Sequence, residues 1–144
     1  MLITKRKPAS VGEVLVEEFL EPMGLTQGAL AEAMGVPRKH VNELCNDRRG
    51  VTAPTALILA RVFGNSPEFW LNVQRRHDLW EAMQILSRAI PPDAIIANGA
   101  GNFATWAHRF WRYSGLRTQI APTAGAMGYG VPAAIAAKIA APER

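Results

Sequence analysis

The chain has 144 residues, of which 49% are apolar, and a formal net charge of +4. These values are typical of a globular protein with one ordinary domain or two small ones. The sequence contains no run of about 18 apolar residues, so it predicts no membrane-spanning helix. Residues 1–84 hold ten basic and ten acidic side chains, so the excess charge lies in residues 85–144, which hold six basic and two acidic ones. Net charge is therefore no argument for nucleic-acid binding by the first part. The single cysteine, Cys45, excludes an internal disulfide and fits a reducing cytoplasm.

Capping residues predict five helices in the first part of the chain. A helix starts well at a side chain that accepts its free N–H groups, and it ends well at a residue that tolerates positive φ. Such signals delimit helices at about Val11–Leu20, from Thr26 to Gly35, from Pro37 to about Asn46, from Thr52 to Gly64, and from Ser66 onward. Ser10, with Glu13 three residues later, forms a capping-box pattern before the first helix. On the last helix, Phe69, Trp70 and Trp80 are expected in the core, with a dimer contact as the alternative for some of them.

The segment QGALAEAMGVPRKHVNELCN, residues 27–46, has the spacing of a helix-turn-helix. Two helices that cross closely need a small residue where they touch, and Ala31 supplies it. The tight turn needs a residue that tolerates positive φ, and Gly35 supplies it four positions later. Apolar residues at helical spacing fall on the facing sides of both helices, with Val41, Leu44 and Cys45 on the second of them. The segment therefore predicts a DNA-binding motif, whereas a plain helical bundle with a solvated face is the alternative.

The predicted DNA-binding side chains are of the types that grip phosphates or read base edges. They are Gln27 at the start of the second helix, Arg38, Lys39, Asn42, Glu43 and Asn46 on the outer face of the third helix, and Arg48 and Arg49 after it. Arg38 and Lys39 lie at the helix N-terminus, which enters the major groove in this motif. Glu43 either accepts a hydrogen bond from a cytosine amino group or pairs with Lys39 one turn earlier.

Residues 8–84 resemble the HigA type of bacterial antitoxin, within the large Xre/Cro-like helix-turn-helix group. The matching strings are PASVGEVLVEEFLEPMGLTQGALAEAMGVPRKHVNEL and RRGVTAPTALILARVFGNSPEFWLNVQRRHDLW. The resemblance implies an all-α, lambda-repressor-like fold, a homodimer that binds a palindromic site in its own promoter, and neutralisation of a HigB-type mRNA-cleaving toxin. On the family pattern, Gln27, Arg38, Lys39 and Asn42 fall on DNA-facing positions. Pro37 stands where many relatives have serine, and Gly28 where a charged residue is usual.

The second part, after Pro91-Pro92, alternates a short β-like run, glycine loops and helices, which is typical of an α/β nucleotide or diphosphate fold. Its strings NGAGNFATW and APTAGAMGYGVPAAIAAKIA resemble the start of the diphosphate-binding domain of acetolactate-synthase-like thiamine-diphosphate enzymes. In that family the residue matching Met127 props the cofactor, and residues around Asn98 and Gly99 lie near it. The family's Gly-Asp-Gly metal motif does not occur in the sequence, and Asp93 and Glu143 are the only carboxylates of residues 93–144. We therefore expect no enzyme activity, cofactor or metal, because a hard divalent cation needs several oxygen ligands.

These observations predict an all-α five-helix helix-turn-helix domain in residues 1–84, a linker in 85–92, and a truncated α/β segment in 93–144. The expected function is that of a cytoplasmic, dimeric autorepressor and antitoxin. One alternative is a fragment or pseudo-subunit of a thiamine-diphosphate enzyme, and another is a transcriptional regulator without a toxin. The run Lys5-Arg6-Lys7 is either an arm that touches phosphates or a solvated terminus.

Overall fold

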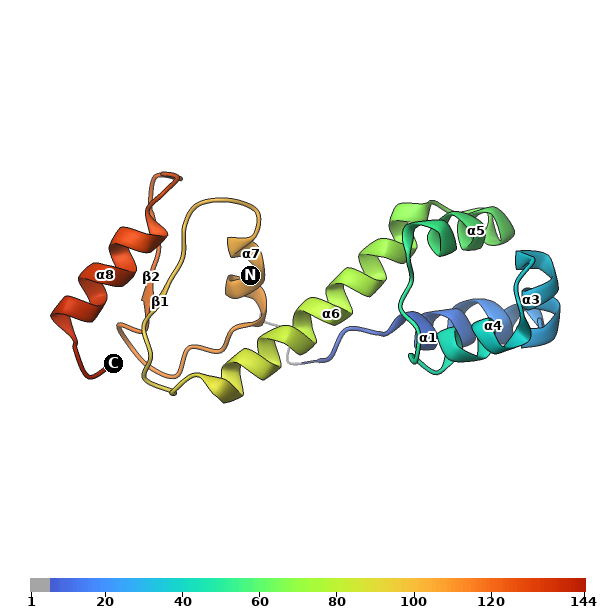
Figure 1. Cartoon of the computed structure of the whole chain (residues 1–144), viewed down its shortest axis with the longest axis horizontal. Helices are drawn as coiled ribbons and strands as arrows, with labels where there is room; N and C mark the ends of the chain where they lie inside the picture. The colour runs from blue at the N-terminus through green and yellow to red at the C-terminus, as the bar shows by residue number, and fades with distance from the viewer. Residues whose placement is uncertain (1–5) are drawn as a thin grey trace. The chain divides into compact units, whose positions relative to one another are not determined.

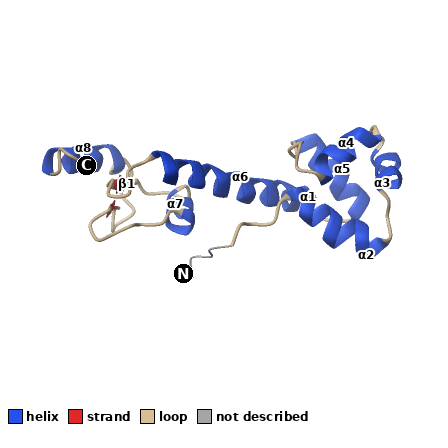
Figure 2. Ribbon diagram, turned by 90° about the horizontal axis from the view of Figure 1, so that it is seen from below, coloured by secondary structure: helices blue, strands red, loops and turns tan. Residues whose placement is uncertain are grey.

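The computed structural model describes residues 6–144, so Lys5 of the basic run lies outside the described residues (Figure 1). The described chain forms two compact units, residues 6–78 and 79–144, and the division falls inside a helix, α6 (Pro67–Ala89). Figure 2 shows helices alone in the first unit, whereas the second also contains two short strands. Within residues 6–144, no helix combines the length and the apolar character that crossing a membrane requires.

The first helical segment is continuous from Val11 to Met23. It comprises α1 (Val11–Val14), a π-helical stretch η1 (Leu15–Leu20) and α2 (Glu21–Met23). The predicted capping box is present: Ser10 Oγ accepts from the Glu13 N–H over 3.0 Å, and the Glu13 carboxylate accepts from the Ser10 N–H over 2.7 Å. Pro22 has no N–H to donate and its ring crowds the preceding turn, so the helix widens to the π pattern beside it. The segment ends at Gly24, beyond the predicted end at Leu20.

The next two helices form the predicted helix-turn-helix. Helix α3 (Gln27–Met34) is capped by Thr26 and ends at Gly35, whose φ of +66° is the left-handed conformation that the turn requires. Helix α4 (Arg38–Cys45) follows Pro37. Ala31 is buried where the two helices touch. Cys45 was predicted on the apolar side of the second helix, but its side chain is only half-buried, at the margin of the core.

Helices α5 (Ala53–Phe63) and α6 complete the first unit. Thr52 caps α5, and Gly64 ends it with a φ of +67°. The core comprises the fully buried side chains Leu15, Leu30, Val41, Leu44, Leu59 and Trp70. Trp70 belongs to the core as predicted, but Phe69 is 39% exposed and Trp80 is half-buried. The five predicted helical segments and the all-α class of this part are thus confirmed.

The second unit is a small α/β segment. Strands β1 (Ile96–Ala97) and β2 (Gln119–Ile120) pair in parallel, with Ile96 opposite Gln119, and α7 (Ala104–Phe110) lies between them in the chain. Helix α8 (Gly130–Ala140) packs on this sheet. The alternation of strand, helix and glycine loop agrees with the predicted class. Residues 85–89 of the expected linker are helical and belong to α6.

Candidate nucleic-acid interface

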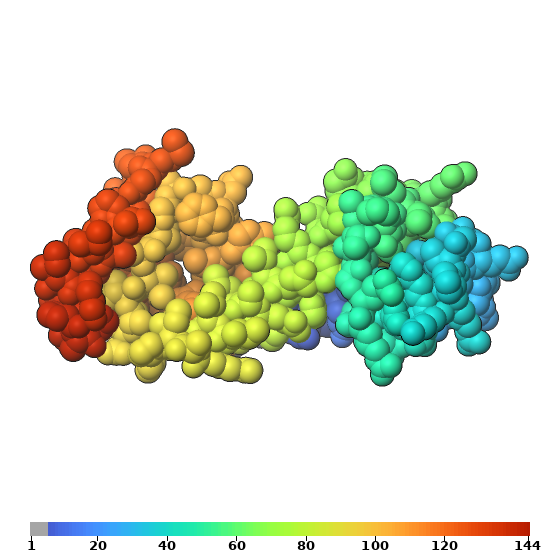
Figure 3. Space-filling view, in the orientation of Figure 1, coloured from blue at the N-terminus to red at the C-terminus, as the bar shows by residue number. Residues whose placement is uncertain are grey.

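The outer face of α4 begins with two exposed cations. Arg38 is the first residue of the helix and Lys39 the second, and both are exposed, with 86% of the Lys39 side chain accessible. In the space-filling view, α3 and α4 form neighbouring parts of the surface of the first unit (Figure 3). The opposite side of α4 packs into the core, where Val41 and Leu44 are fully buried. Two exposed positive side chains at the start of such a helix suit an anionic surface.

Gln27 and Asn42 form a hydrogen bond that joins the start of α3 to the middle of α4. Asn42 Nδ2 donates to Gln27 Oε1 over 3.1 Å on the exposed surface. The bond uses the carbonyl oxygen of Gln27, so its Nε2 group is left to donate outward. It also fixes the orientation of the Asn42 amide, whose oxygen and second N–H point away from this bond. Sequence reasoning selected both residues but gave no sign that they bind each other.

Glu43 lies between two cations, and Arg49 binds it more closely than Lys39 does. The Glu43 carboxylate accepts from Arg49 Nε over 2.8 Å and lies 2.7 Å from Arg49 Nη2, whereas Lys39 Nζ is 3.9 Å away. The hydrogen bond from Arg49 is the main reason why the pKa of the Glu43 carboxyl lies below its ordinary value. Pairing with Lys39 was one of the predicted alternatives, but Arg49 is a partner that helical spacing does not reveal.

The two remaining predicted residues lie at the end of α4. Asn46 Nδ2 donates to the carbonyl of Asn42 over 2.7 Å, so its side chain folds back along the helix. Arg48 is exposed, and its backbone N–H donates to the carbonyl of Glu43 over 2.8 Å. Hydrogen bonds and ion pairs thus link Gln27 to Asn42 and Asn46, and Lys39 to Glu43 and Arg49.

Asp47 is a positioning residue that the sequence analysis missed. Its carboxylate accepts hydrogen bonds from the Gly12 N–H over 2.9 Å and from Ser10 Oγ over 2.5 Å. Asp47 has a φ of +52°, and aspartate is one of the few residues other than glycine found in this conformation. The bonds join the loop after α4 to the N-terminus of α1, and so fix the orientation of this loop. An aspartate followed by two arginines gives no local signal for a contact 35 residues away.

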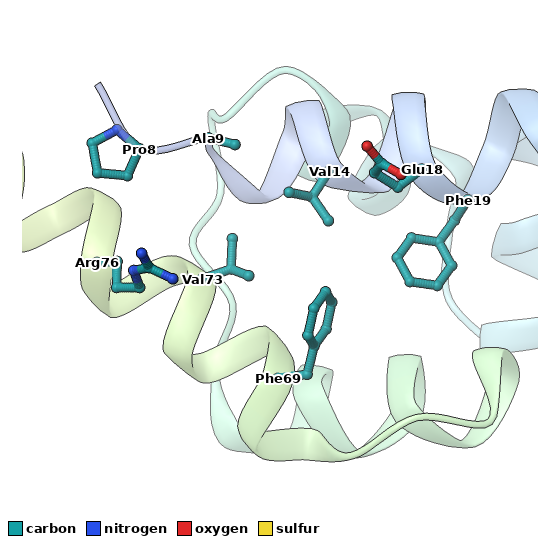
Figure 4. Close-up of a pocket in the computed structure, with 8 residues that line it drawn as sticks. All are labelled: Pro8, Ala9, Val14, Glu18, Phe19, Phe69, Val73 and Arg76. Atoms are coloured by element: carbon teal, nitrogen blue, oxygen red, sulfur yellow. The ribbon is translucent and has the colours of Figure 1, made fainter. Parts of the chain in front are cut away.

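An apolar groove of about 500 Å³ lies on other elements of the first unit. Figure 4 shows Val14 and Phe19 on one side and Phe69 and Val73 of α6 on the other. Phe69 contacts Phe19 and Trp70 at ring-centroid distances of 6.1 and 5.1 Å, yet 39% of its surface is exposed. The groove also carries one acid and one base, Glu18 and Arg76.

The second unit does not fit a thiamine-diphosphate site. Met127, at the cofactor-propping position, is 91% exposed, and residues 6–144 contain no cluster of three metal-ligating side chains. The buried Asn98 bonds to its neighbour, the Gly99 carbonyl, over 3.1 Å. A Cβ on Gly130 would lie 3.0 Å from the Gly99 nitrogen, so these glycines allow the loop after β1 to pack against the start of α8. They serve close packing in this segment, and we derive no cofactor chemistry from it.

Comparison with known proteins gives separate results for the two parts of the chain. A family model described as helix-turn-helix matches residues 16–70. "Antitoxin HigA-1" of Vibrio cholerae is 62% identical over 79 residues, which are 54% of this chain and 73% of that protein. The chain belongs to the HigA family of antitoxins.

Solved structures of similar proteins agree with this assignment to the HigA family. Antitoxin GraA is 44% identical with a TM-score of 0.54, over 55% of this chain and 85% of GraA. The Pseudomonas aeruginosa antitoxin HigA, solved with the higBA promoter, is 34% identical with a TM-score of 0.53, over 59% of this chain and 97% of its own. These relatives are antitoxins and not enzymes.

The second part of this HigA-family chain matches a different family. The C-terminal, thiamine-pyrophosphate-binding domain of thiamine pyrophosphate enzymes matches residues 99–144. Acetolactate synthase 3 of Brassica napus is 40% identical over 63 residues, which are 43% of this chain but only 10% of that enzyme. Both predicted resemblances are therefore confirmed, and the second concerns a small fraction of the enzyme.

Proposed function

We propose that the chain is a DNA-binding antitoxin that represses the promoter of its own toxin–antitoxin pair as a homodimer. The observation that carries this proposal is the exposed start of α4, where Arg38 and Lys39 stand beside the Gln27–Asn42 amide pair. The promoter complex of the related Pseudomonas aeruginosa antitoxin supports it. Such a protein acts in the cytoplasm, where its promoter lies.

The proposed contacts divide into those that hold the DNA backbone and those that read bases. Gln27 Nε2 donates to a phosphate, helped by the free N–H groups at the start of α3, and Arg48 and Arg49 hold the adjacent backbone. Arg38 and Lys39 enter the major groove, where cationic side chains bind guanine O6 and N7. Asn42 uses its remaining amide groups to bind an adenine edge. Asn46 and Glu43 complete the surface, and their internal hydrogen bonds limit how far they extend.

We propose the groove between residues 8–19 and α6 as the homodimer contact. A palindromic operator requires a two-fold partner, and a two-fold contact uses the same patch on both copies. An apolar groove with a half-exposed phenylalanine is suited to this role, and its Glu18 and Arg76 offer opposite charges to a second copy. None of the proposed DNA contacts lines it. Analytical ultracentrifugation tests this: Phe69→Asp should yield monomers, whereas Leu71→Asp, on the same helix but outside the groove lining, should remain dimeric.

The proposed protein partner is a HigB-type mRNA-cleaving toxin. The support is the family of the first 84 residues, since the similar Vibrio cholerae protein is named Antitoxin HigA-1. An RNA-cleavage assay with a purified HigB-type toxin tests this, because the chain should abolish cleavage at equimolar concentration. No inhibition would favour a regulator without a toxin.

We further propose residues 1–84 as the functional domain, 85–92 as the joining segment and 93–144 as an appended unit without a catalytic role.

Fluorescence anisotropy on the chain's own upstream DNA, with excess non-specific competitor and at two salt concentrations, tests the DNA-binding proposal. The full chain should bind despite competitor. The double variant Arg38→Ala plus Lys39→Ala should lose about 100-fold or more in affinity, since each good base contact is worth about 1–3 kcal/mol. A double variant with the same charge change on α6, Arg75→Ala plus Arg88→Ala, serves as control and should bind normally. Binding that is weak and indifferent to the first double variant would contradict the proposal.

A further inference from the structure

The Glu43 carboxylate binds the guanidinium group of Arg49, one of the cations of the proposed DNA surface. It contacts both Nε and Nη2 of Arg49, at 2.8 and 2.7 Å, and its side chain is only 22% exposed although it stands on the outer face of α4. Arg49 is 47% exposed, so the guanidinium is both paired and accessible from outside. Carboxylate and phosphate oxygens bind a guanidinium in the same way, through two of its N–H groups. A DNA phosphate therefore competes with Glu43 for Arg49.

The backbone maintains this arrangement. Arg49 follows Asp47, whose φ of +52° reverses the chain after α4, and the Arg48 N–H donates to the carbonyl of Glu43 over 2.8 Å. Asp47 is itself bound to Ser10 and Gly12 at the start of α1. The loop thus returns Arg49 to the side chain six residues before it. The contact follows from the local fold rather than from a chance approach of two long side chains.

We propose that Glu43 lowers the affinity of this surface for the DNA backbone by occupying Arg49 in place of a phosphate, so that stable binding depends on base contacts. This rests on the proposed function as a DNA-binding protein. On any DNA, a phosphate must either displace the carboxylate from Arg49 or share Arg49 with it, and in both cases it lies close to a negative charge. On the operator, base contacts from Arg38, Lys39 and Asn42 offset this cost. On other sequences those contacts are missing, so only the cost remains. The hydrogen bond from Arg49 also lowers the pKa of the Glu43 carboxyl, as expected for a carboxylate bound to a guanidinium.

The test compares Glu43→Gln with the wild-type chain on operator DNA and on random DNA of the same length. Glutamine has nearly the same shape but no charge, so Arg49 becomes available to phosphates. Non-operator affinity should rise about five- to tenfold, and the plot of log K against log salt should steepen by about 0.9, the value for one additional phosphate contact. Operator affinity should rise by a similar factor, because the cost that Glu43 imposes does not depend on the base sequence. Glu17→Gln makes the same charge change on η1, and it should leave the salt slope unchanged.

Arg49→Ala separates a role through Arg49 from a general charge effect. In that background, Glu43→Gln should no longer steepen the salt dependence, because there is no guanidinium to release. An unchanged affinity of Glu43→Gln for random DNA would overturn the proposal. A loss of operator affinity confined to one cytosine position would also overturn it, since Glu43 would then be a base reader. If the wild-type chain itself bound both DNAs alike, the proposed function would fail instead, so the two failures are distinguishable.

Discussion

The backbone N–H of Gly12 donates a hydrogen bond to the carboxylate of Asp47 over 2.9 Å, joining the first turn of α1 to the loop that ends α4. The approach is close enough to exclude any side chain at residue 12. A Cβ there would lie 2.7 Å from the carbonyl oxygen of Cys45 and 2.9 Å from that of Leu44. The end of α4 is therefore held by a close backbone approach to α1 as well as by the core behind it.

Gly12→Ala should destabilise the first unit by about 1–3 kcal/mol, because the added methyl forces α1 away from the end of α4. Urea unfolding followed by circular dichroism measures this. Gly28→Ala is the matched control: a Cβ at Gly28 meets nothing closer than 3.7 Å, and alanine in α3 should stabilise the fold by about 0.5–1 kcal/mol. Equal changes in the free energy of unfolding of the two variants would mean that the close approach at Gly12 does not affect stability.

Asp47→Ala should remove both hydrogen bonds of this contact and lower stability by about 1–3 kcal/mol. Asp47→Gly should be the milder change, since glycine adopts a φ of +52° without strain although it restores neither bond. Thermal unfolding of the two variants distinguishes the lost bonds from the backbone strain. If alanine and glycine gave the same melting temperature, strain at residue 47 would be negligible.

Gln27→Ala should reduce operator affinity about tenfold, because a phosphate donor is lost and Asn42 loses the bond that orients its amide. Asn42→Ala should reduce affinity and relax preference at one base pair. If the amide pair acts as a unit, the double variant should lose less than the sum of the two single changes. Anisotropy titrations of all four proteins on the operator give the coupling, and strict additivity would show that the two residues act independently.

Cys45 should react slowly with iodoacetamide in the folded protein. Burial raises the pKa of its thiol, with the nearby Asp47 carboxylate as a smaller cause, so the reactive thiolate is scarce at neutral pH. Because the pKa of Cys45 is raised in the folded state, the thiol contributes fully to folding stability below its unfolded-state pKa. It loses this contribution as pH rises through its folded-state pKa. At pH 8 we expect alkylation about tenfold slower than in the urea-unfolded chain, measured by mass spectrometry. Equal rates would contradict the protected thiol.

Ending the chain at Gln84 should leave operator binding unchanged, because the proposed contact residues and the core of the first unit all lie before that position. A variant ending at Ala89 is the control, since it keeps the whole of α6. Anisotropy on the operator compares both with the full chain. Lost binding in both shorter forms would assign the second unit a role in DNA binding, and loss only at Gln84 would assign it to the last part of α6.

Much of the fold could be predicted because its signals are local. Caps such as Thr26 and Thr52 bond to N–H groups three residues away, and Gly35 and Gly64 take positive φ where each helix ends. The apolar spacing of α3 and α4 likewise depends on neighbours within two turns. Strand β2 was not predicted, because its two residues are defined by pairing with β1 across more than 20 residues of chain. The same limit applies to the partly exposed Phe69, whose environment depends on helices far apart in sequence.

The sequence by itself determined the five helices, the helix-turn-helix and the residue types on its outer face, since each depends on capping, backbone conformation and helical period. Only the tertiary structure decided which of those residues bind one another. The Gln27–Asn42 pair, the choice of Arg49 over Lys39 by Glu43, and the anchoring of Asp47 at Gly12 all depend on how helices cross and how a loop returns. The physical reason is that side-chain pairing depends on distance in space, which local sequence constrains within a helix but not between helices.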